Sequence, residues 1–531
     1  MKDKYISLKE YKKYYSKIPI VELKKHNTKF INDKIIEYKD YFDQMFRDID
    51  PNVKLDEEQI KAVLVDEDYE MVIAGAGSGK TTTMSAKVKY LVEKRQIDPT
   101  QIIMISYTNE AIKELKTRIN DEFKIPVNIY TFHKFCLDII RKKEKVKILS
   151  DNEIIFKEYF KFNTFFYKKY LRTNNLKKYF KFLLTKKIFD DDIEICYKFL
   201  NLFRTEGYDS FDFLLVGKSS KKEKSFLNLV EDIYKYYNKY LKKYNLIDFD
   251  GMIIKATKIV KKEDVKYKYL IIDEYQDISN LRFKFVQKLV KVSDIKLIVV
   301  GDDFQSIYSF SGSDISLFLN FKKTFGYASI LKITNTYRNS QELIDIVGKF
   351  VMKNKEQINK KLISNKHIDN PVVLVKYKNK IKQLENCIKI IIKEYGCNKN
   401  ILLLGRYLND IKFISKSEKF MICENDIKYS LYPNLKITFL TIHASKGLGY
   451  DNVIVLNNEK GKYGFPTNVK NNKFLDMLSN EESYMYAEER RLFYVALTRT
   501  KNRVYLLYSN NNCSIFIKEI LLQLKKQRFM I

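Results

Sequence analysis

The chain has 531 residues, 45% of them apolar, which is enough for several domains with packed cores and excludes a disordered chain. Lys and Arg total 97 against 66 Asp and Glu, which gives a net charge of +31. Six Cys without any Cys-x-x-Cys pair argue against a zinc ribbon, an iron–sulfur cluster or a disulfide scaffold. The N-terminus lacks the apolar core of a signal peptide, and no run approaches the roughly 18 apolar residues of a membrane span, so we expect an intracellular protein without membrane contact.

The excess of positive charge has two explanations. It suits a polyanionic partner, most often nucleic acid. It also suits the composition of an AT-rich genome, because the chain is rich in Lys, Asn, Ile and Tyr. Charge alone does not choose between them, so the choice depends on motifs.

The hydropathy pattern divides the chain into helical and mixed regions. Residues 1–50 are expected to form a basic helical extension. In 51–140 short apolar runs alternate with amphipathic stretches, which is typical of a parallel sheet. Residues 141–245 lose the strand pattern and are expected to form an aromatic, basic, helical insertion, after which the alternation returns in 246–328 and in a second region at 329–531. The expected strands are 71–75, 101–106, 269–274, 296–302, 372–377, 401–405, 437–442, 452–457 and 502–509.

The segment MVIAGAGSGKTTT (71–83) combines an apolar strand, a Gly-rich loop and a helix start. Such a loop turns its backbone N–H groups toward phosphates. Lys80 is expected to reach the β- and γ-phosphates, and the Thr81 hydroxyl to ligate Mg²⁺. A chance Gly-rich turn is the alternative, and the preceding strand and the Lys-Thr pair disfavour it. The expected ATP-binding residues of the loop are Ala74 (Gly in the strict pattern), Gly75, Ala76, Gly77, Ser78, Gly79, Lys80, Thr81 and Thr82.

An acidic pair follows the apolar strand in LIIDEYQD (270–277). Asp273 is expected to hold Mg²⁺, often through water, and Glu274 to orient or deprotonate the attacking water. An Asp-Glu pair at a strand end is common, and a solvated strand end is the alternative. Together with the phosphate loop, the pair favours ATP hydrolysis over binding alone.

Ten segments, the first starting at Leu55 and the last running through Arg503 to Leu507, then occur in one order. They are LDEEQ (55–59), AGAGSGKT (74–81), SYTNEAIKEL (106–115), YTFHKF (130–135), DFDGMI (248–253), IIDEYQD (271–277), VGDDFQSIYSFSGSD (300–314), NTYRNS (335–340), TIHASKGLGYDNVIVL (441–456) and EERRLFYVALTRTKNRVYLL (488–507). In this set and order the chain resembles the UvrD/Rep/PcrA-like superfamily 1 DNA helicases. Each segment alone is weak, but ten in order are specific.

The resemblance assigns roles at the nucleotide. Gln59 matches the family glutamine that contacts the adenine edge, and Tyr337 matches the aromatic that stacks on adenine. Gln305 matches the γ-phosphate sensor. Arg338 and Arg499 match two arginine fingers of the second motor domain, and the planar, permanently charged guanidinium suits phosphate. Fingers across a cleft from the phosphate loop would make closure depend on the γ-phosphate.

The resemblance also assigns residues to single-stranded DNA. Tyr107, Tyr308 and Phe310 match aromatics that stack on bases, an interaction worth roughly 1–3 kcal/mol per base that tolerates any sequence. For each of these side chains taken alone, core packing or helix capping is the alternative. The polar positions expected along the DNA are Thr108, Asn109, Thr131, His133, Thr441 and His443.

The chain departs from the family pattern at several positions. Gly449 stands where the family has a Glu that contacts the nucleotide sugar, which puts sugar discrimination in doubt. Phe310 replaces the usual Trp, Ser311 an Arg and Glu110 a Lys, changes that could weaken the grip on DNA. The interval from Arg338 to His443 is too short for the second helical accessory domain of full-length relatives, which we expect to be absent or vestigial. The chain also ends soon after the last motif, so we expect no fused nuclease domain.

The expected fold is therefore α/β, with two RecA-like P-loop motor domains, a helical insertion in the first and ATP with Mg²⁺ between them. The expected activity is ATP-dependent 3′→5′ translocation on single-stranded DNA with unwinding of tailed duplex DNA. One alternative is a DNA-stimulated ATPase that translocates but unwinds poorly alone. The other is a DNA-binding scaffold with a decayed ATP site. Host, pathway and protein partners are not specified by the sequence.

Overall fold

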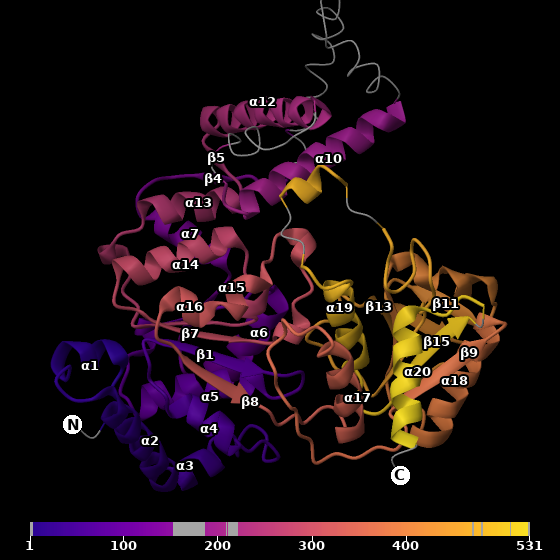
Figure 1. Ribbon diagram of the computed structural model, residues 1–531, viewed down its shortest axis with the longest axis horizontal. Helices are drawn as coiled ribbons and strands as arrows, with labels where there is room; N and C mark the ends of the chain where they lie inside the picture. The colour runs from indigo at the N-terminus through magenta and orange to yellow at the C-terminus, as the bar shows by residue number, and fades with distance from the viewer. Residues whose placement is uncertain are drawn as a thin grey trace, which may run out of the picture.

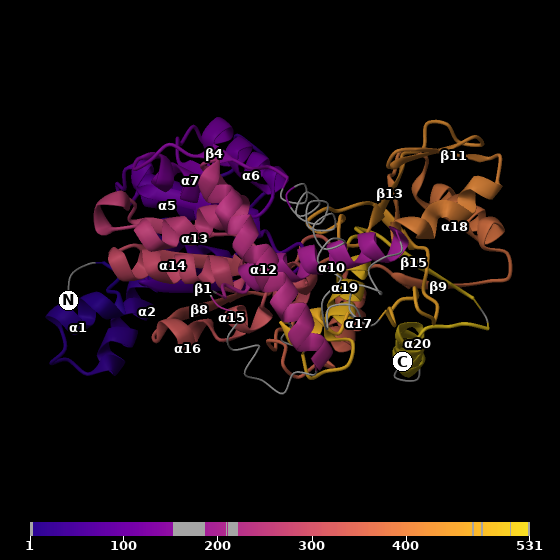
Figure 2. The ribbon, with the colours of Figure 1, turned by 90° about the horizontal axis from the view of Figure 1, so that it is seen from above.

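The computed structural model describes residues 4–151, 155, 186–208, 210, 221–469, 472–478, 482–509 and 511–528. Two α/β units lie side by side, with a helical insertion above the first (Figure 1). Seen from above, helices α10 and α12 of the insertion extend from the first unit toward the second (Figure 2). The predicted α/β class is confirmed. Within the described residues, no helix is both long and apolar enough to cross a bilayer.

The first unit is built on a six-stranded parallel sheet in the order β3-β2-β6-β7-β1-β8. Alternate side chains of its central strands enter two apolar clusters, one on each face, which explains why these strands are continuous Val/Ile runs. The strands are β1 (Tyr69–Ala74), β2 (Ile102–Ile105), β3 (Asn128–Tyr130), β6 (Tyr269–Ile272), β7 (Lys296–Gly301) and β8 (Ser329–Ile333). The helices around them are α4 (Glu57–Leu64), α5 (Lys80–Glu93), α6 (Asn109–Lys116), α7 (Phe132–Arg141), α13 (Phe249–Ile259), α14 (Asn280–Val292), α15 (Ile315–Leu319) and α16 (Phe321–Phe325).

The four strands expected in this unit are present, but β3 and β8 were not predicted. β8 pairs with β1, so the first sheet continues past residue 328, where the expected boundary between the motor domains lay. That boundary was wrong by one strand. The reason is physical: β8 is a short edge strand whose burial pattern is mostly half-exposed, so it lacks the apolar run of the central strands.

The N-terminal extension is helical, as expected. It comprises α1 (Leu8–Tyr14), α2 (Ile20–Glu37) and α3 (Lys39–Gln44). Phe42 and Phe46 pack with Leu64 and Tyr90 of the first unit. The backbone N–H of Leu8 donates to the Glu67 carboxylate at 2.8 Å. The extension therefore braces the first unit.

The insertion begins and ends at a two-stranded parallel pair, β4 (Lys147–Ile148) with β5 (Leu246–Ile247). Its described helices are α10 (Lys186–Thr205) and α12 (Lys221–Lys243), as the helical pattern predicted. Arg204 of α10 pairs with Asp248, which caps α13 and also accepts from the Tyr237 hydroxyl. Most of the aromatic segment 156–187, which was expected to be helical, lies outside the described residues.

The second unit has a seven-stranded sheet in the order β11-β12-β13-β10-β14-β15-β9. All five strands predicted here are present, and an antiparallel hairpin adds β11 and β12 at one edge. The strands are β9 (Val372–Tyr377), β10 (Ile401–Gly405), β11 (Phe420–Cys423), β12 (Asp426–Tyr429), β13 (Ile437–Thr441), β14 (Asn452–Val455) and β15 (Val504–Ser509). The helices are α17 (Gln341–Val351), α18 (Lys380–Tyr395), α19 (Ala487–Leu497) and α20 (Ile515–Arg528). The described elements between residues 338 and 443, from α17 to β13, belong to this unit.

The second unit also reaches the insertion. A loop before α19 forms a single turn at Leu475–Met477, which lies under α10 in Figure 1. Phe474 stacks on Phe226 of α12, with ring centroids 4.0 Å apart and planes at 14°. Leu478 is buried in the same apolar cluster as the facing sides of α10 and α12. The insertion is therefore packed against both α/β units.

Candidate ATP site and DNA-facing seam

The phosphate loop lies between the end of β1 and the start of α5, against the second unit. Gly79 precedes α5 in the left-handed conformation, and Gly77 has φ +72°. A Cβ on Gly77 would lie only 2.4 Å from the Cβ of Arg338. Ala76 belongs to the same apolar cluster as α17 and α19. The loop therefore fits against the second unit because Gly77 has no side chain that would collide with Arg338.

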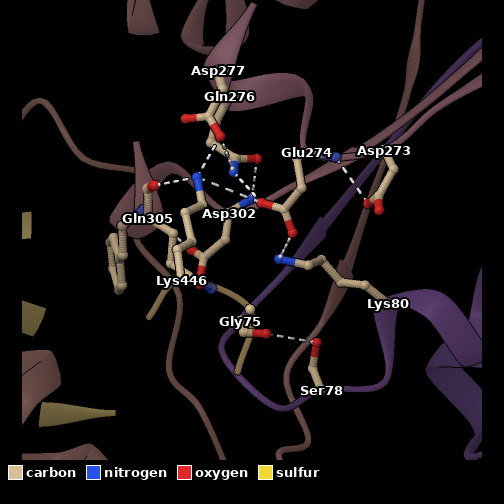
Figure 3. Close-up of polar contacts among 12 residues, drawn as sticks. Gly75, Ser78, Lys80, Asp273, Glu274, Gln276, Asp277, Asp302, Gln305 and Lys446 are labelled. Carbon is tan, nitrogen blue, oxygen red and sulfur yellow. Dashed lines mark hydrogen bonds and ion pairs between the residues drawn. The ribbon is translucent and has the colours of Figure 1, made fainter. Parts of the chain in front are cut away.

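Lys80 and Glu274 meet at the centre of the site (Figure 3), with the ammonium nitrogen 3.0 Å from the carboxylate. Lys446, from the second unit, lies 3.7 Å from the other oxygen of Glu274 and pairs with Asp277. Burial alone would raise the pKa of Glu274, but Lys80 and Lys446 outweigh it and hold that pKa at about 2. Glu274 is therefore ionised, as a group that orients or accepts a proton from water must be.

Asp273 is in a different electrostatic environment. Burial and the neighbouring Glu274 charge raise the pKa of Asp273 to about 7. Its carboxylate accepts the Glu274 backbone N–H at 2.8 Å, and within the described residues it forms no ion pair. A buried carboxylate of this kind, near the first turn of α5 that carries Thr81, fits a divalent cation. Mg²⁺ needs few protein ligands when nucleotide phosphates supply the rest, and the described residues hold no cluster of three His, Cys, Asp or Glu that could bind a metal alone.

Gln305 belongs to a hydrogen-bonded network on the first unit. Its side-chain amide donates to Asp302 at 2.6 Å. Gln276 accepts the Asp302 backbone N–H at 2.9 Å and donates to Glu274, so one chain of contacts joins Gln305 to Glu274 (Figure 3). We did not predict roles for Gln276, Asp277, Asp302 or Lys446, although the motifs that contain them were recognised.

Arg338 and Arg499 approach the site from the second unit. Arg338 donates to the Gly447 carbonyl at 3.2 Å, and Arg499 donates to the Leu448 carbonyl at 3.0 Å and to the Gln305 side chain at 3.4 Å. Burial and the Arg338 charge lower the pKa of Arg499 to about 9. Neither guanidinium forms an ion pair within the described part of the chain. Two partly or fully buried arginines whose partners in the described residues are uncharged carbonyl, amide and hydroxyl groups suit an incoming polyanion.

The residues expected at adenine are joined through Asp56, which sequence reasoning did not single out. Asp56 caps α4 and shares a capping box with Gln59. The Tyr337 hydroxyl donates to the same carboxylate at 2.8 Å, and Tyr337 is 58% exposed. Gln59 also donates to the Ser78 carbonyl at 3.1 Å. The hydroxyl of Thr82, in contrast, accepts from Arg118 at 2.8 Å.

Three of the expected DNA residues form one aromatic cluster where the two α/β units contact each other. We call this contact surface the seam. The Phe310 ring lies 5.4 Å from that of His443 and 6.0 Å from that of Tyr308. The Tyr308 hydroxyl donates to the His443 carbonyl at 3.2 Å, and the Lys446 ammonium lies 4.9 Å from its ring. Phe310 is 69% exposed, so the cluster presents a ring to solvent.

The other expected DNA residues have local structural roles. Tyr107 packs edge-on against Phe132, with the Arg282 guanidinium 5.3 Å from its ring. The hydroxyls of Thr108 and Thr131 cap α6 and α7, each accepting a backbone N–H at 3.1 Å. His133 packs on Phe249, Thr441 accepts the Ala444 N–H at 3.3 Å, and Asn109 is exposed. The helix-capping alternative therefore accounts for the contacts of both capping threonines.

Gly449 lies beside Arg338. A Cβ at this position would be 3.2 Å from the Arg338 guanidinium. The position at which the family pattern has a Glu is thus next to an arginine of the candidate ATP site.

Together these contacts define a P-loop protein whose candidate nucleotide site lies between two α/β units. The family model of the UvrD/REP helicase N-terminal domain matches residues 55–326, and that of the UvrD-like helicase C-terminal domain matches residues 423–511. The chain belongs to the UvrD/Rep helicase family, as its motifs predicted.

Curated relatives agree. The chain is 29% identical to DNA helicase IV of Escherichia coli (strain K12) over 518 residues, which cover 93% of this chain and 73% of that protein. It is 31% identical to a probable DNA helicase II homolog of Mycoplasma capricolum, over 66% of this chain and 49% of that protein. It is 30% identical to the ATP-dependent DNA helicase Rep of Buchnera aphidicola (subsp. Acyrthosiphon pisum), over 68% of this chain and 55% of that protein. The chain thus spans about half the length of the last two relatives.

Proposed function

We propose that this protein hydrolyses ATP to move 3′→5′ along single-stranded DNA and to unwind tailed duplex DNA inside the cell. The observation that carries the proposal is the seam itself. Lys446 of the second unit contacts the proposed catalytic carboxylate of Glu274 and the carboxylate of Asp277, and it also lies over the Tyr308 ring of the aromatic cluster. The nucleotide site and the proposed DNA platform therefore share one interface between the motor domains.

The proposed cycle follows from this arrangement. ATP binds with its phosphates on residues 75–81 and its base between Gln59 and Tyr337. Thr81 and Asp273 would hold Mg²⁺, which would neutralise part of the phosphate charge. Arg338 and Arg499 then bind the γ-phosphate and hold the units closed. Glu274 positions the attacking water, and Gln305 senses the γ-phosphate. Loss of that phosphate releases the arginines, so the units open and the aromatic cluster moves along the DNA.

The aromatic platform is proposed to stack on DNA bases through Phe310, Tyr308 and His443. Phe310 contacts the two other rings of the cluster but remains 69% exposed, so a face is free for a base. The capped N-termini of α6 and α7 offer backbone N–H groups and hydroxyls to the phosphate backbone, which adds affinity without sequence preference. We assign Tyr107, Thr108, Asn109, Thr131, His133 and Thr441 to this track.

A second candidate function is translocation with little unwinding by the chain alone. The observation that favours it is the interval from 338 to 443, which the second α/β unit fills without a further helical domain. A non-catalytic scaffold is less well supported, because Lys80, Glu274, Gln305, Arg338 and Arg499 all converge on one site.

The test is strand displacement on duplexes with a 3′ or a 5′ single-stranded tail, with ATP turnover recorded in the same reactions. We expect DNA-stimulated turnover and opening of the 3′-tailed duplex alone. Turnover without opening would favour the second candidate, and opening from the 5′ tail alone would refute the polarity. The control is Lys80→Ala, which removes the phosphate contact and should abolish turnover; if the parent chain has no DNA-stimulated turnover, both motor functions fail.

A further inference from the structure

A segment outside the ten motifs enters the ATP site. After α17 of the second unit, residues 357–364 run back along the first unit, and we call them the return segment. Ile363 pairs with Asn335, and its backbone N–H donates to the Thr334 carbonyl at 2.9 Å. Leu362 lies so close to the phosphate loop that a Cβ on Gly75 would be 2.7 Å from it. The return segment therefore touches both the phosphate loop and the connection between the units.

Lys360 of the return segment is buried, with 1% of its side chain exposed. Its ammonium pairs with both Asp302 and Asp303, whose side chains are fully buried, and lies 3.7 Å from the centre of the Phe304 ring. Burial would lower the pKa of Lys360, but the two carboxylates outweigh burial and raise it. The side chain is therefore a charged group inside the protein, which is costly unless its partners compensate.

The two carboxylates have different second partners. Asp303 accepts the backbone N–H of Ile358 at 2.8 Å, a contact that holds the return segment in place. Asp302 accepts the side-chain amide of Gln305 at 2.6 Å through the oxygen that Lys360 does not contact. Lys360 thus reaches Gln305 through one carboxylate only.

We propose that Lys360 is a positioning residue for ATP hydrolysis, which fixes Asp302 so that Asp302 orients the Gln305 side chain toward the γ-phosphate. The inference rests on the proposed function for the role of Gln305. Without the ammonium, the Asp302 oxygen that Lys360 contacts keeps only the Phe304 backbone N–H, at 3.1 Å, so the carboxylate is held less firmly as an acceptor for the Gln305 amide. The nitrogen of the Gln305 amide donates to Asp302, and the oxygen of the same amide accepts from Arg499 at 3.4 Å. A rotation of Asp302 would therefore also move the oxygen that Arg499 contacts.

The test compares Lys360→Met with Lys361→Met, since Lys361 is the exposed neighbour on the same segment. We expect Lys360→Met to lower kcat of DNA-stimulated ATP turnover by about 10- to 100-fold, with KM for ATP changed less than about threefold, because a lost positioning contact acts in the transition state. Lys360→Arg, which keeps the charge, should recover part of kcat. Lys361→Met should match the parent chain.

A double-mutant cycle with Gln305→Ala decides whether Lys360 acts through Gln305. If it does, Lys360→Met should cost less than about twofold more in a Gln305→Ala background. An equal loss in both backgrounds, or a Lys360→Met chain with parental kcat, would overturn the inference. The parent chain's own DNA-stimulated turnover tests the proposed function separately, so the two failures are distinguishable.

A matched pair of carboxylate variants covers the case in which Lys360→Met does not fold. Asp302→Asn and Asp303→Asn each remove one buried partner of Lys360, but only Asp302 contacts Gln305. We expect Asp302→Asn to lower kcat at least tenfold more than Asp303→Asn at similar thermal stability. Equal kcat in the two variants would overturn the inference.

Discussion

Replacing Gly77 with Ala should separate the two motor units without removing any catalytic group. The added Cβ would lie 2.4 Å from the Arg338 Cβ and 3.0 Å from the Thr336 hydroxyl. The first of these atoms belongs to the start of a side chain, so no rotamer change can move it away. The backbone at φ +72° adds about 1–2 kcal/mol of strain for an L-residue, whether the units are open or closed.

Because the backbone strain is the same in the open and closed states, only the steric overlap opposes closure of the two units. Overpacking of this kind costs roughly 1–3 kcal/mol. Since every 1.4 kcal/mol is a factor of ten, kcat/KM for ATP in the presence of DNA should fall by about 5- to 150-fold. The assay is steady-state ATP turnover on saturating single-stranded DNA, with the midpoint of thermal unfolding measured in parallel.

Two other glycines serve as controls. Gly348→Ala, in α17, meets nothing within 4 Å and should leave kcat/KM unchanged while stabilising the helix by about 0.5–1 kcal/mol. Gly75→Ala meets the mobile end of Leu362, so its effect should be smaller than that of Gly77→Ala. Parental kcat/KM in the Gly77→Ala chain would refute the argument that the second unit closes directly on the phosphate loop.

Three further predictions concern other parts of the molecule. Phe474→Ala removes the stack on Phe226, worth about 0.5–1.5 kcal/mol beyond its buried area, so hydrogen exchange in α10 and α12 should speed up; unchanged exchange would contradict the contact. Tyr337→Phe removes only the hydrogen bond to Asp56, worth about 0.5–1.5 kcal/mol, so KM for ATP should rise by about 2- to 10-fold. Tyr337→Ala also removes the ring and should raise KM further. Equal KM values for the Phe and Ala variants would exclude a role for the ring. Burial lowers the pKa of His443 to about 4, so its contribution to stability is complete above pH 6.5 and is lost as the pH falls toward 4. The thermal midpoint of His443→Asn should therefore fall less than that of the parent chain over that pH range, and parallel curves would contradict the shift.

The sequence determined those features that depend on neighbours along the chain. The strands of both sheets were readable because a parallel strand buried on both faces must be an apolar run, as in β7 and β10. The phosphate loop was readable because a strand, three glycines and Lys80 lie in one continuous segment. Edge strands such as β8 carry no such run, and the boundary between the units was misplaced for that reason.

Only the tertiary structure decided which charges meet across the seam. In the sequence Lys360 and Lys361 are adjacent and alike, two of 97 basic residues. The fold turns one to solvent and buries the other between Asp302 and Asp303, which are 58 and 57 residues away. Asp56 likewise reads as an ordinary helix cap, yet it accepts the Tyr337 hydroxyl 281 residues along the chain. A local sequence pattern does not predict such contacts, because they form only when the two α/β units share an interface.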